Sequence, residues 1–247
     1  MFKSIFGAFK KKEEPLPDFS FLGTDMHSHL IPGIDDGAKT IEDSIALIRE
    51  LHGMGYKKFY TTPHIMSDYF RNTPEIINEG LANVRKAIEQ EGIPVEIHAA
   101  AEYYIDDGFM RKLENEKLLT IGENYLLFEI SYINCPENIS EMIFRMQVLG
   151  YRPILAHPER YPFWYNNFEQ YQTFRDQGVL LQVNLNSLGG YYGYDAKRIA
   201  EKLVEANQVD LLGTDCHHLK HIEGLKRTLK EKSLRKLSET NLLNRHL

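Results

Sequence analysis

Histidines, carboxylates and polar pairs recur at one kind of position in this 247-residue chain, directly after a short apolar segment. The segments end in T-D-M-H-S-H, F-Y-T-T-P-H, A-A-A-E, L-L-F-E, I-L-A-H-P-E-R, L-Q-V-N-L-N and L-L-G-T-D-C-H-H. In parallel α/β folds the loops after the strand carboxyl ends build the active site, so residues far apart in sequence converge there. The pattern therefore predicts a metal-lined barrel mouth.

The first segment carries two histidines, His27 and His29, which would lie on one face of a strand and can hold one metal ion together. An acidic turn, Asp35-Asp36-Gly37, follows and can supply an oxygen ligand from a loop held by glycine. For the neighbouring Asp35, a turn or helix-capping role fits as well as ligation.

The middle segments add His64, Glu102, Glu129 and His157. Each histidine alone could be a hydrogen-bonded core residue. Glu102 and Glu129 are more informative, because carboxylates that close apolar strands are rarely buried without a partner, and metal ions would be such partners.

The last segment repeats the two-residue spacing with Asp215 and His217, and a closed barrel would place it beside the first strand. Arg160 follows the A-H-P-E-R strand and is placed to reach an anionic substrate, although a surface salt bridge would also explain it. His218 and His221 are close enough to the mouth to assist in proton transfer. The amides Asn184 and Asn186 end the sixth segment.

Helical patterns separate these segments and indicate how the chain positions them. We expect strands at 23–26, 58–62, 95–101, 125–130, 153–156, 179–184 and 209–213, with helices between them and one or two surface helices over 230–247. Strands that alternate with helices imply βαβ crossovers and a parallel sheet. Seven such units favour an α/β barrel in a single domain, residues 19–247, over an open sheet.

Composition excludes several classes of protein. The net charge of -6 argues against binding to nucleic acid through phosphate neutralisation. The two cysteines, Cys135 and Cys216, fit a reducing compartment, and neither is followed by the C-x5-R arginine of a cysteine phosphatase. No apolar run approaches the roughly 18 residues of a membrane-spanning helix.

Residues 1–18 form a tail and linker before the barrel. Phe2, Ile5, Phe6 and Phe9 fall at helical spacing beside a lysine cluster, which predicts weak contact with an anionic membrane surface, although a mobile tail explains the same residues. We therefore expect a cytoplasmic protein, with peripheral contact at the inner membrane as the further prediction.

Taken together, H-S-H with D-D-G, T-P-H, A-E, F-E, A-H-P-E-R and T-D-C-H resemble the polymerase and histidinol phosphatase (PHP) superfamily over roughly residues 22–225. The branch most similar is the bacterial tyrosine-protein phosphatases of capsule and exopolysaccharide synthesis. This resemblance implies a distorted (β/α)7 TIM-like barrel with three divalent metal ions, usually manganese, iron or zinc. It also implies hydrolysis of phosphotyrosine on a partner tyrosine autokinase.

The resemblance implies a role for each motif residue. One ion would be bound by His27, His29, Glu102 and Asp215, a second by Glu102, Glu129 and His157, and a third by Asp36, His64 and His217. Arg160 would grip the phosphate. Relatives often carry a further arginine shortly after the final D-x-H, whereas this chain reads L-K-H-I-E-G there, which leaves the second phosphate-binding group open.

The mixed histidine and carboxylate set suits Mn, Fe or Zn better than Ca, with Mn2+ as our expectation. Clustered ions would lower the pKa of a bridging water to give hydroxide, the expected nucleophile. Asp215, His217 or His218 could protonate the leaving phenolate. Two classes of alternative remain open. The first is another enzyme on the same barrel, either a phosphatase for a small ester such as histidinol phosphate or an exonuclease. The second is a non-catalytic, metal-holding scaffold for a kinase.

Overall fold

The computed structural model describes residues 14–247, in which short parallel strands alternate with helices. The strands are β1 (Thr24–Asp25), β2 (Lys58–Thr61), β3 (His64–Ile65), β4 (Glu96–Ala99), β5 (Glu102–Tyr104), β6 (Tyr125–Glu129), β7 (Arg152–Ala156), β8 (Leu180–Asn184) and β9 (Leu211–Gly213). The helices are α1 (Ile41–Gly53), α2 (Pro74–Gln90), α3 (Phe109–Asn115), α4 (Ile139–Val148), α5 (Glu169–Asp176), α6 (Leu185–Leu188), α7 (Tyr194–Glu205), α8 (Leu219–Thr228) and α9 (Lys232–Ser238).

The strands form two parallel sheets, ordered β1-β2-β4 and β3-β5-β6-β7-β8-β9. The expected strands 58–62 and 95–101 form as β2 and β4, and each is followed, after a break of two residues, by a further short strand beyond its predicted end, β3 and β5. The first break falls at Pro63, which has no N–H to donate to a ladder. The Glu102 N–H donates to the Pro63 carbonyl at 3.1 Å, and this bond keeps the two broken strands adjacent. His64 and Glu102 therefore begin these further strands instead of following a strand end.

The first and last strands are also neighbours. Ser28 and Cys216 form a parallel bridge just beyond β1 and β9. On either side of it, the Asp215 N–H donates to the His27 carbonyl at 2.8 Å and the His29 N–H to the Cys216 carbonyl at 3.0 Å. These bonds bring the H-S-H and T-D-C-H motifs together, although nearly 190 residues separate them.

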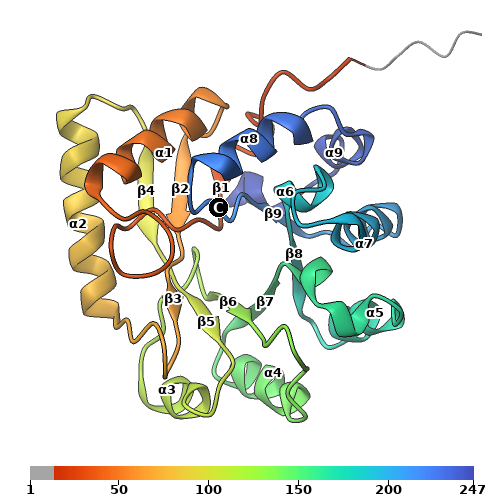
Figure 1. Ribbon diagram of the computed structural model, residues 1–247. Helices are drawn as coiled ribbons and strands as arrows, with labels where there is room; N and C mark the ends of the chain where they lie inside the picture. The colour runs from red at the N-terminus through yellow and green to blue at the C-terminus, as the bar shows by residue number, and fades with distance from the viewer. Residues whose placement is uncertain (1–13) are drawn as a thin grey trace, which may run out of the picture.

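The helices pack around the outside of the strands (Figure 1). Their ends follow the sequence signals: Thr40 and Asp43 form a capping box at α1, and Thr73 caps α2 ahead of Pro74. Apolar faces such as that of α2 pack against the strands in the main core. A smaller apolar cluster is formed by residues in or next to the strands, and Leu243 and Leu247 pack against it. Its members are Met26, Tyr60, Ala100, Ile121, Leu127, Ile154, Ala156 and Leu211.

Some boundaries differ from expectation. The short helix α6, which directly follows β8, was not predicted. The C-terminal stretch forms α9 and a 3-10 turn, as expected of surface helices, but Asn244 is buried and joins Thr24 to Leu212 through its amide. The chain end therefore closes the strand layer in addition to covering the surface.

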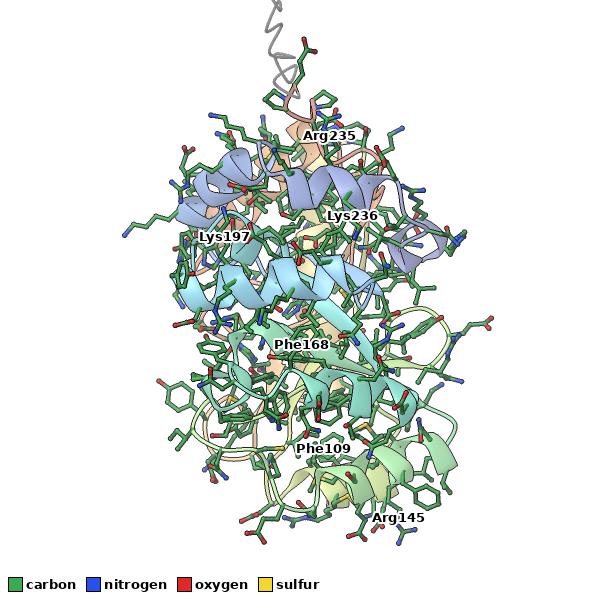
Figure 2. The ribbon with its side chains drawn as sticks, turned by 90° about the vertical axis from the view of Figure 1, so that its right-hand side faces the viewer. Phe109, Arg145, Phe168, Lys197, Arg235 and Lys236 are labelled. Carbon is green, nitrogen blue, oxygen red and sulfur yellow. The ribbon has the colours of Figure 1, made fainter. Side chains whose placement is uncertain are left out.

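The outer helical face is polar. Lys197 of α7 pairs with Glu231 at 2.9 Å and lies on the same side of the molecule as Arg235 and Lys236 (Figure 2). No helix within residues 14–247 is long and apolar enough to cross a membrane. The apolar and lysine-rich stretch for which membrane contact is predicted, up to residue 12, lies outside the described residues, so that contact stays a prediction.

Candidate metal centre

A hollow of about 380 Å3 opens where the strand carboxyl ends and the strand breaks meet. It is lined by Asp36, His64, Met66, Glu102, Tyr104, Glu129, Tyr132, His157, Arg160, Tyr192, Asp215, His217, His218 and His221. His27 and His29 lie fully buried behind this lining. The expected site residues are thus gathered in one place.

The first group of side chains surrounds two imidazole nitrogens. The Nε2 atom of His27 lies 3.2 Å from Glu102 Oε2 and 3.4 Å from Asp215 Oδ1. The Nε2 atom of His29 lies 3.5 and 3.4 Å from the same two oxygens. These four side chains have almost no exposure, so a divalent cation among them would be shielded from water.

The second group shares Glu102 with the first. Its other oxygen, Oε1, lies 2.9 Å from His157 Nε2, which is 3.8 Å from Glu129 Oε2. His64 approaches the same carboxylates, with Nδ1 at 3.0 Å from Glu129 Oε1 and 3.2 Å from Glu102 Oε2. Glu102 thus presents one oxygen to each group, the geometry of a bridging carboxylate.

The third group lies nearest to solvent. Asp36 Oδ1 is 3.3 Å from His217 Nε2 and 3.5 Å from His64 Nε2. The Asp36 side chain is 57% exposed, whereas the two imidazoles are 12 to 13% exposed. His29 reaches this group as well, because its ring stacks on that of His217 at 3.9 Å between centroids.

Neighbouring oxygen atoms orient the rings. The Nδ1 atom of His27 bonds to Gln182 Oε1, and that of His29 to Asp35 Oδ2, both at 2.8 Å. The Nδ1 atom of His217 bonds to the Asp215 carbonyl at 2.9 Å. These bonds aim each Nε2 atom at the centre, the arrangement that metal-binding histidines use. Asp35 therefore supports His29, and Gln182 was missed in the sequence, although it lies two residues before Asn184 on the same strand face.

The residues fit a divalent cation. His64 Nδ1 is buried and, despite its two close carboxylates, has no hydrogen bond of acceptable geometry. Burial lowers the pKa of His64, but the charges of Glu102 and Glu129 outweigh burial and raise that pKa to about 9. Without a cation these carboxylates therefore favour a proton on the His64 imidazole, a position that a metal ion would take. Nitrogen and carboxylate donors in this mixture suit Mn, Fe or Zn.

Two residues of the groups have strained backbones. His157 has φ 35° and Asp215 has φ 49°, in the left-handed region that residues with a Cβ seldom occupy. Such strain persists only where the surroundings enforce it, and it concentrates at functional sites. The strand ends therefore bend sharply at the point where these two side chains enter the hollow.

Arg160 lies at the wall of the hollow with its side chain 24% exposed. Its Nη1 atom donates to Asp215 Oδ2 at 2.9 Å, and its guanidinium lies between the rings of Tyr192 and Tyr132, 4.1 and 5.1 Å from their centroids. These cation–π contacts fix the direction of the guanidinium. Nothing in the sequence singles out the two tyrosines beyond their proximity to the motif segments.

The other expected polar residues take supporting positions. Asn184 donates to Asp215 Oδ2 at 2.7 Å, while Asn186 lies in α6 and bonds to the His221 carbonyl outside the lining. His218 and His221 both line the hollow. Burial lowers the pKa of His221 to about 4, so its ring is neutral at pH 7.

The cysteines lie apart from this chemistry. Cys216 is fully buried, and burial raises the pKa of its thiol. Burial also raises the pKa of the Cys135 thiol, and neither residue lines the hollow. A thiolate nucleophile is therefore disfavoured at both positions.

Known proteins are similar to this chain in sequence and in structure. Tyrosine-protein phosphatase YwqE of Bacillus subtilis is 29% identical over 79% of this chain and 78% of its own, and tyrosine-protein phosphatase CpsB of Streptococcus pneumoniae is 29% identical over 79% and 83%. A crystal structure from work on YwqE and CpsB, described as unique metal-dependent tyrosine phosphatases, superimposes with a TM-score of 0.77 at 28% identity, covering 84% of this chain and 86% of that one.

More distant structures share the fold alone. Histidinol phosphate phosphatase from Lactococcus lactis has a TM-score of 0.50 at 12% identity, covering 84% of this chain and 92% of its own. The family described as capsular polysaccharide synthesis, CpsB/CapC, matches residues 23–240, which confirms the resemblance seen in the motifs. The chain belongs to the CpsB/CapC family.

Proposed function

We propose that this protein is a metal-dependent protein-tyrosine phosphatase that hydrolyses phosphotyrosine on a bacterial tyrosine autokinase of capsular or exopolysaccharide synthesis. The observation that carries this proposal is the position of Glu102, whose two oxygens face two groups of imidazoles at the floor of the hollow. The family membership and the tyrosine-phosphatase activity for which YwqE and CpsB are named support it.

We further propose that the strands close into a barrel and that the site binds three metal ions. The bridge between Ser28 and Cys216 supports a closed, distorted (β/α)7 barrel as a single domain over residues 19–247. Three divalent ions, with Mn2+ as the first choice and Fe or Zn as the others, would be held by the three groups of ligands. Bound ions would supply a nucleophile from water at neutral pH and neutralise phosphoryl charge.

The side chains around the ions have separate tasks. Arg160, held between two tyrosine rings, donates to the phosphoryl oxygens as charge develops there. Asp215 already accepts from Arg160 and Asn184, and its other oxygen faces the imidazoles, so it has no free oxygen with which to deliver a proton. His217 is committed in the same way, because its Nδ1 atom donates to the Asp215 carbonyl and its Nε2 atom faces Asp36 in the third group. Of the three expected proton donors, His218 therefore remains as the candidate to protonate the leaving phenolate.

Phosphate release from a tyrosine-phosphorylated peptide tests the proposal. A chelator should abolish release and Mn2+ should restore it, while elemental analysis of the same sample reports the metal content. Histidinol phosphate in parallel separates a small-ester phosphatase from a protein phosphatase. Binding of the phosphopeptide without release at full metal loading would leave the scaffold alternative and refute the enzyme.

A further inference from the structure

A second hollow, of about 400 Å3, opens beside the hollow that contains the three groups of imidazoles and carboxylates, which we call the metal hollow. The two share Asp36, His217 and His218, which form the wall between them. A peptide whose phosphorylated side chain enters the metal hollow must continue across the surrounding surface. Its neighbouring side chains therefore come within reach of the second hollow.

The second hollow is lined largely by apolar groups. Ala38, Ala46, Leu47 and Leu219 contribute to its wall, and Leu219 is 55% exposed although it is a large apolar residue. Among the charged residues at this hollow, Lys39 donates from Nζ to the Asp35 carbonyl at 3.1 Å.

The carboxylate of Asp43 accepts from the backbone N–H groups of Lys39 and Thr40 as part of the α1 capping box. These local bonds occupy polar groups at the edge of the second hollow. Lys220 is charged as well and contributes to the lining. The apolar part of the lining suits an apolar side chain.

Other exposed apolar residues lie around the same mouth. Tyr69 is 77% exposed and packs edge-on against Phe70, whose ring stacks on His64 at 5.4 Å between centroids. Ile133 is 88% exposed and directly follows Tyr132, a lining residue of the metal hollow. Exposed apolar groups gathered at one place mark an interaction surface. A small ester confined to the metal hollow would leave these groups uncovered, whereas a protein segment would cover them.

We infer that the second hollow binds an apolar side chain adjacent to the phosphotyrosine in an extended segment of the substrate protein. This inference rests on the proposed function and narrows its substrate class. The phosphotyrosine would be flanked by an apolar residue, and the selectivity would come from burial of that residue between α1 and the start of α8.

Three substrates test the inference with the metal-loaded enzyme. They are p-nitrophenyl phosphate, a phosphotyrosine peptide with leucine on both sides, and the same peptide with glycine on both sides. The wild-type kcat/KM should be roughly tenfold or more higher for the leucine peptide, the discrimination that small apolar differences produce in a pocket. Ala46→Glu, which places a charge in the second hollow, and Leu219→Ser, which removes part of its wall, should each reduce that preference severalfold.

The controls separate the subsite from the catalytic centre. Turnover of p-nitrophenyl phosphate by both variants should stay within about twofold of wild type, because this substrate has no flanking residue. Phe144→Ser removes an equally apolar side chain, 62% exposed on α4, and should leave the peptide preference intact. Equal wild-type activity on the two peptides, or a full preference in both hollow variants, would overturn the inference. No turnover of any substrate would instead refute the proposed function.

Discussion

Arg160 and Asp215 are joined by a 2.9 Å hydrogen bond at the boundary between the metal ligands and the space above them. The bond uses one of the five donors of the guanidinium, so the others remain available to a phosphoryl group. Asp215 is also held by Asn184, which means that removal of Arg160 leaves this carboxylate oriented. Arg160 can therefore serve the substrate without being required for the fold.

We expect Arg160→Ala to lower kcat/KM for a phosphotyrosine peptide by roughly 10- to 1000-fold, the loss typical of one preorganised donor to a developing anion. Arg160→Lys should recover only part of this loss, because a point charge lacks the two-pronged geometry. Metal content and melting temperature should barely change. Arg198→Ala, which removes a partly buried arginine paired with Asp195, is the matched control and should retain full activity. Loss of metal in Arg160→Ala would instead show a structural role.

Substitution of Glu102 should do more damage to the metal content than substitution of any other single ligand. Glu102→Gln keeps the shape but removes the charge that two groups of imidazoles share, so both of those groups should lose affinity for cations. Elemental analysis after reconstitution should show fewer ions per chain, together with loss of phosphatase activity. Glu96→Gln, with a side chain 60% exposed on β4, serves as the control. Full metal content in Glu102→Gln would exclude a bridging role.

Thiol reagents should leave the activity unchanged. Cys216 is buried and its raised pKa keeps it protonated at neutral pH, and Cys135 lies outside the lining of the hollow. Activity should survive treatment with iodoacetamide, with mass spectrometry used to follow alkylation of the native protein. The isosteric Cys216→Ser variant should likewise turn over at a rate close to wild type. If this variant lost turnover while its metal content stayed normal, a thiol mechanism would have to replace the metal mechanism.

The sequence predicts which histidines and carboxylates gather at the hollow better than it predicts their surroundings. The spacing of His27 and His29 implies one face of a strand, and acidic residues after apolar strands imply partners, so each local pattern carries its own chemistry. Gln182 and Tyr192 carry no such pattern, because their roles arise from contacts with His27 and Arg160 across the fold.

The same reason explains the errors in the predicted strands. A proline at position 63 signals a break in the strand. Only the pairing with the neighbouring strand β5 shows that extended structure resumes directly after this proline, as β3. Helix α6 was missed because its four residues, Leu185–Leu188, are too few to show a helical period in the sequence. Tertiary context decides both cases.

We expect the buried carboxyl of Asp25 to make the free energy of unfolding depend on pH. It is fully buried beneath the H-S-H motif and accepts hydrogen bonds from Thr214, from Oγ1 at 2.6 Å and from the N–H at 3.0 Å. Burial raises the pKa of this carboxyl to about 6, because those bonds offset only part of the cost of burying its charge. The folded state therefore holds a proton that the unfolded chain, with its ordinary pKa near 3.8, releases at lower pH.

The direction of the pH dependence follows from the difference between the folded and unfolded pKa values of Asp25. The stabilisation from protonated Asp25 is complete below pH 3.8 and is lost as the pH rises through about 6. Asp25→Asn cannot ionise, so the free energy of unfolding of wild type minus that of the variant should fall by roughly 1 to 2 kcal/mol between pH 5 and pH 7.5. Urea unfolding of chelator-treated protein at the two pH values measures this difference, with the variant as the reference for every other titrating group. An unchanged difference would mean that Asp25 is ionised in the folded protein throughout this range, held by its bonds to Thr214.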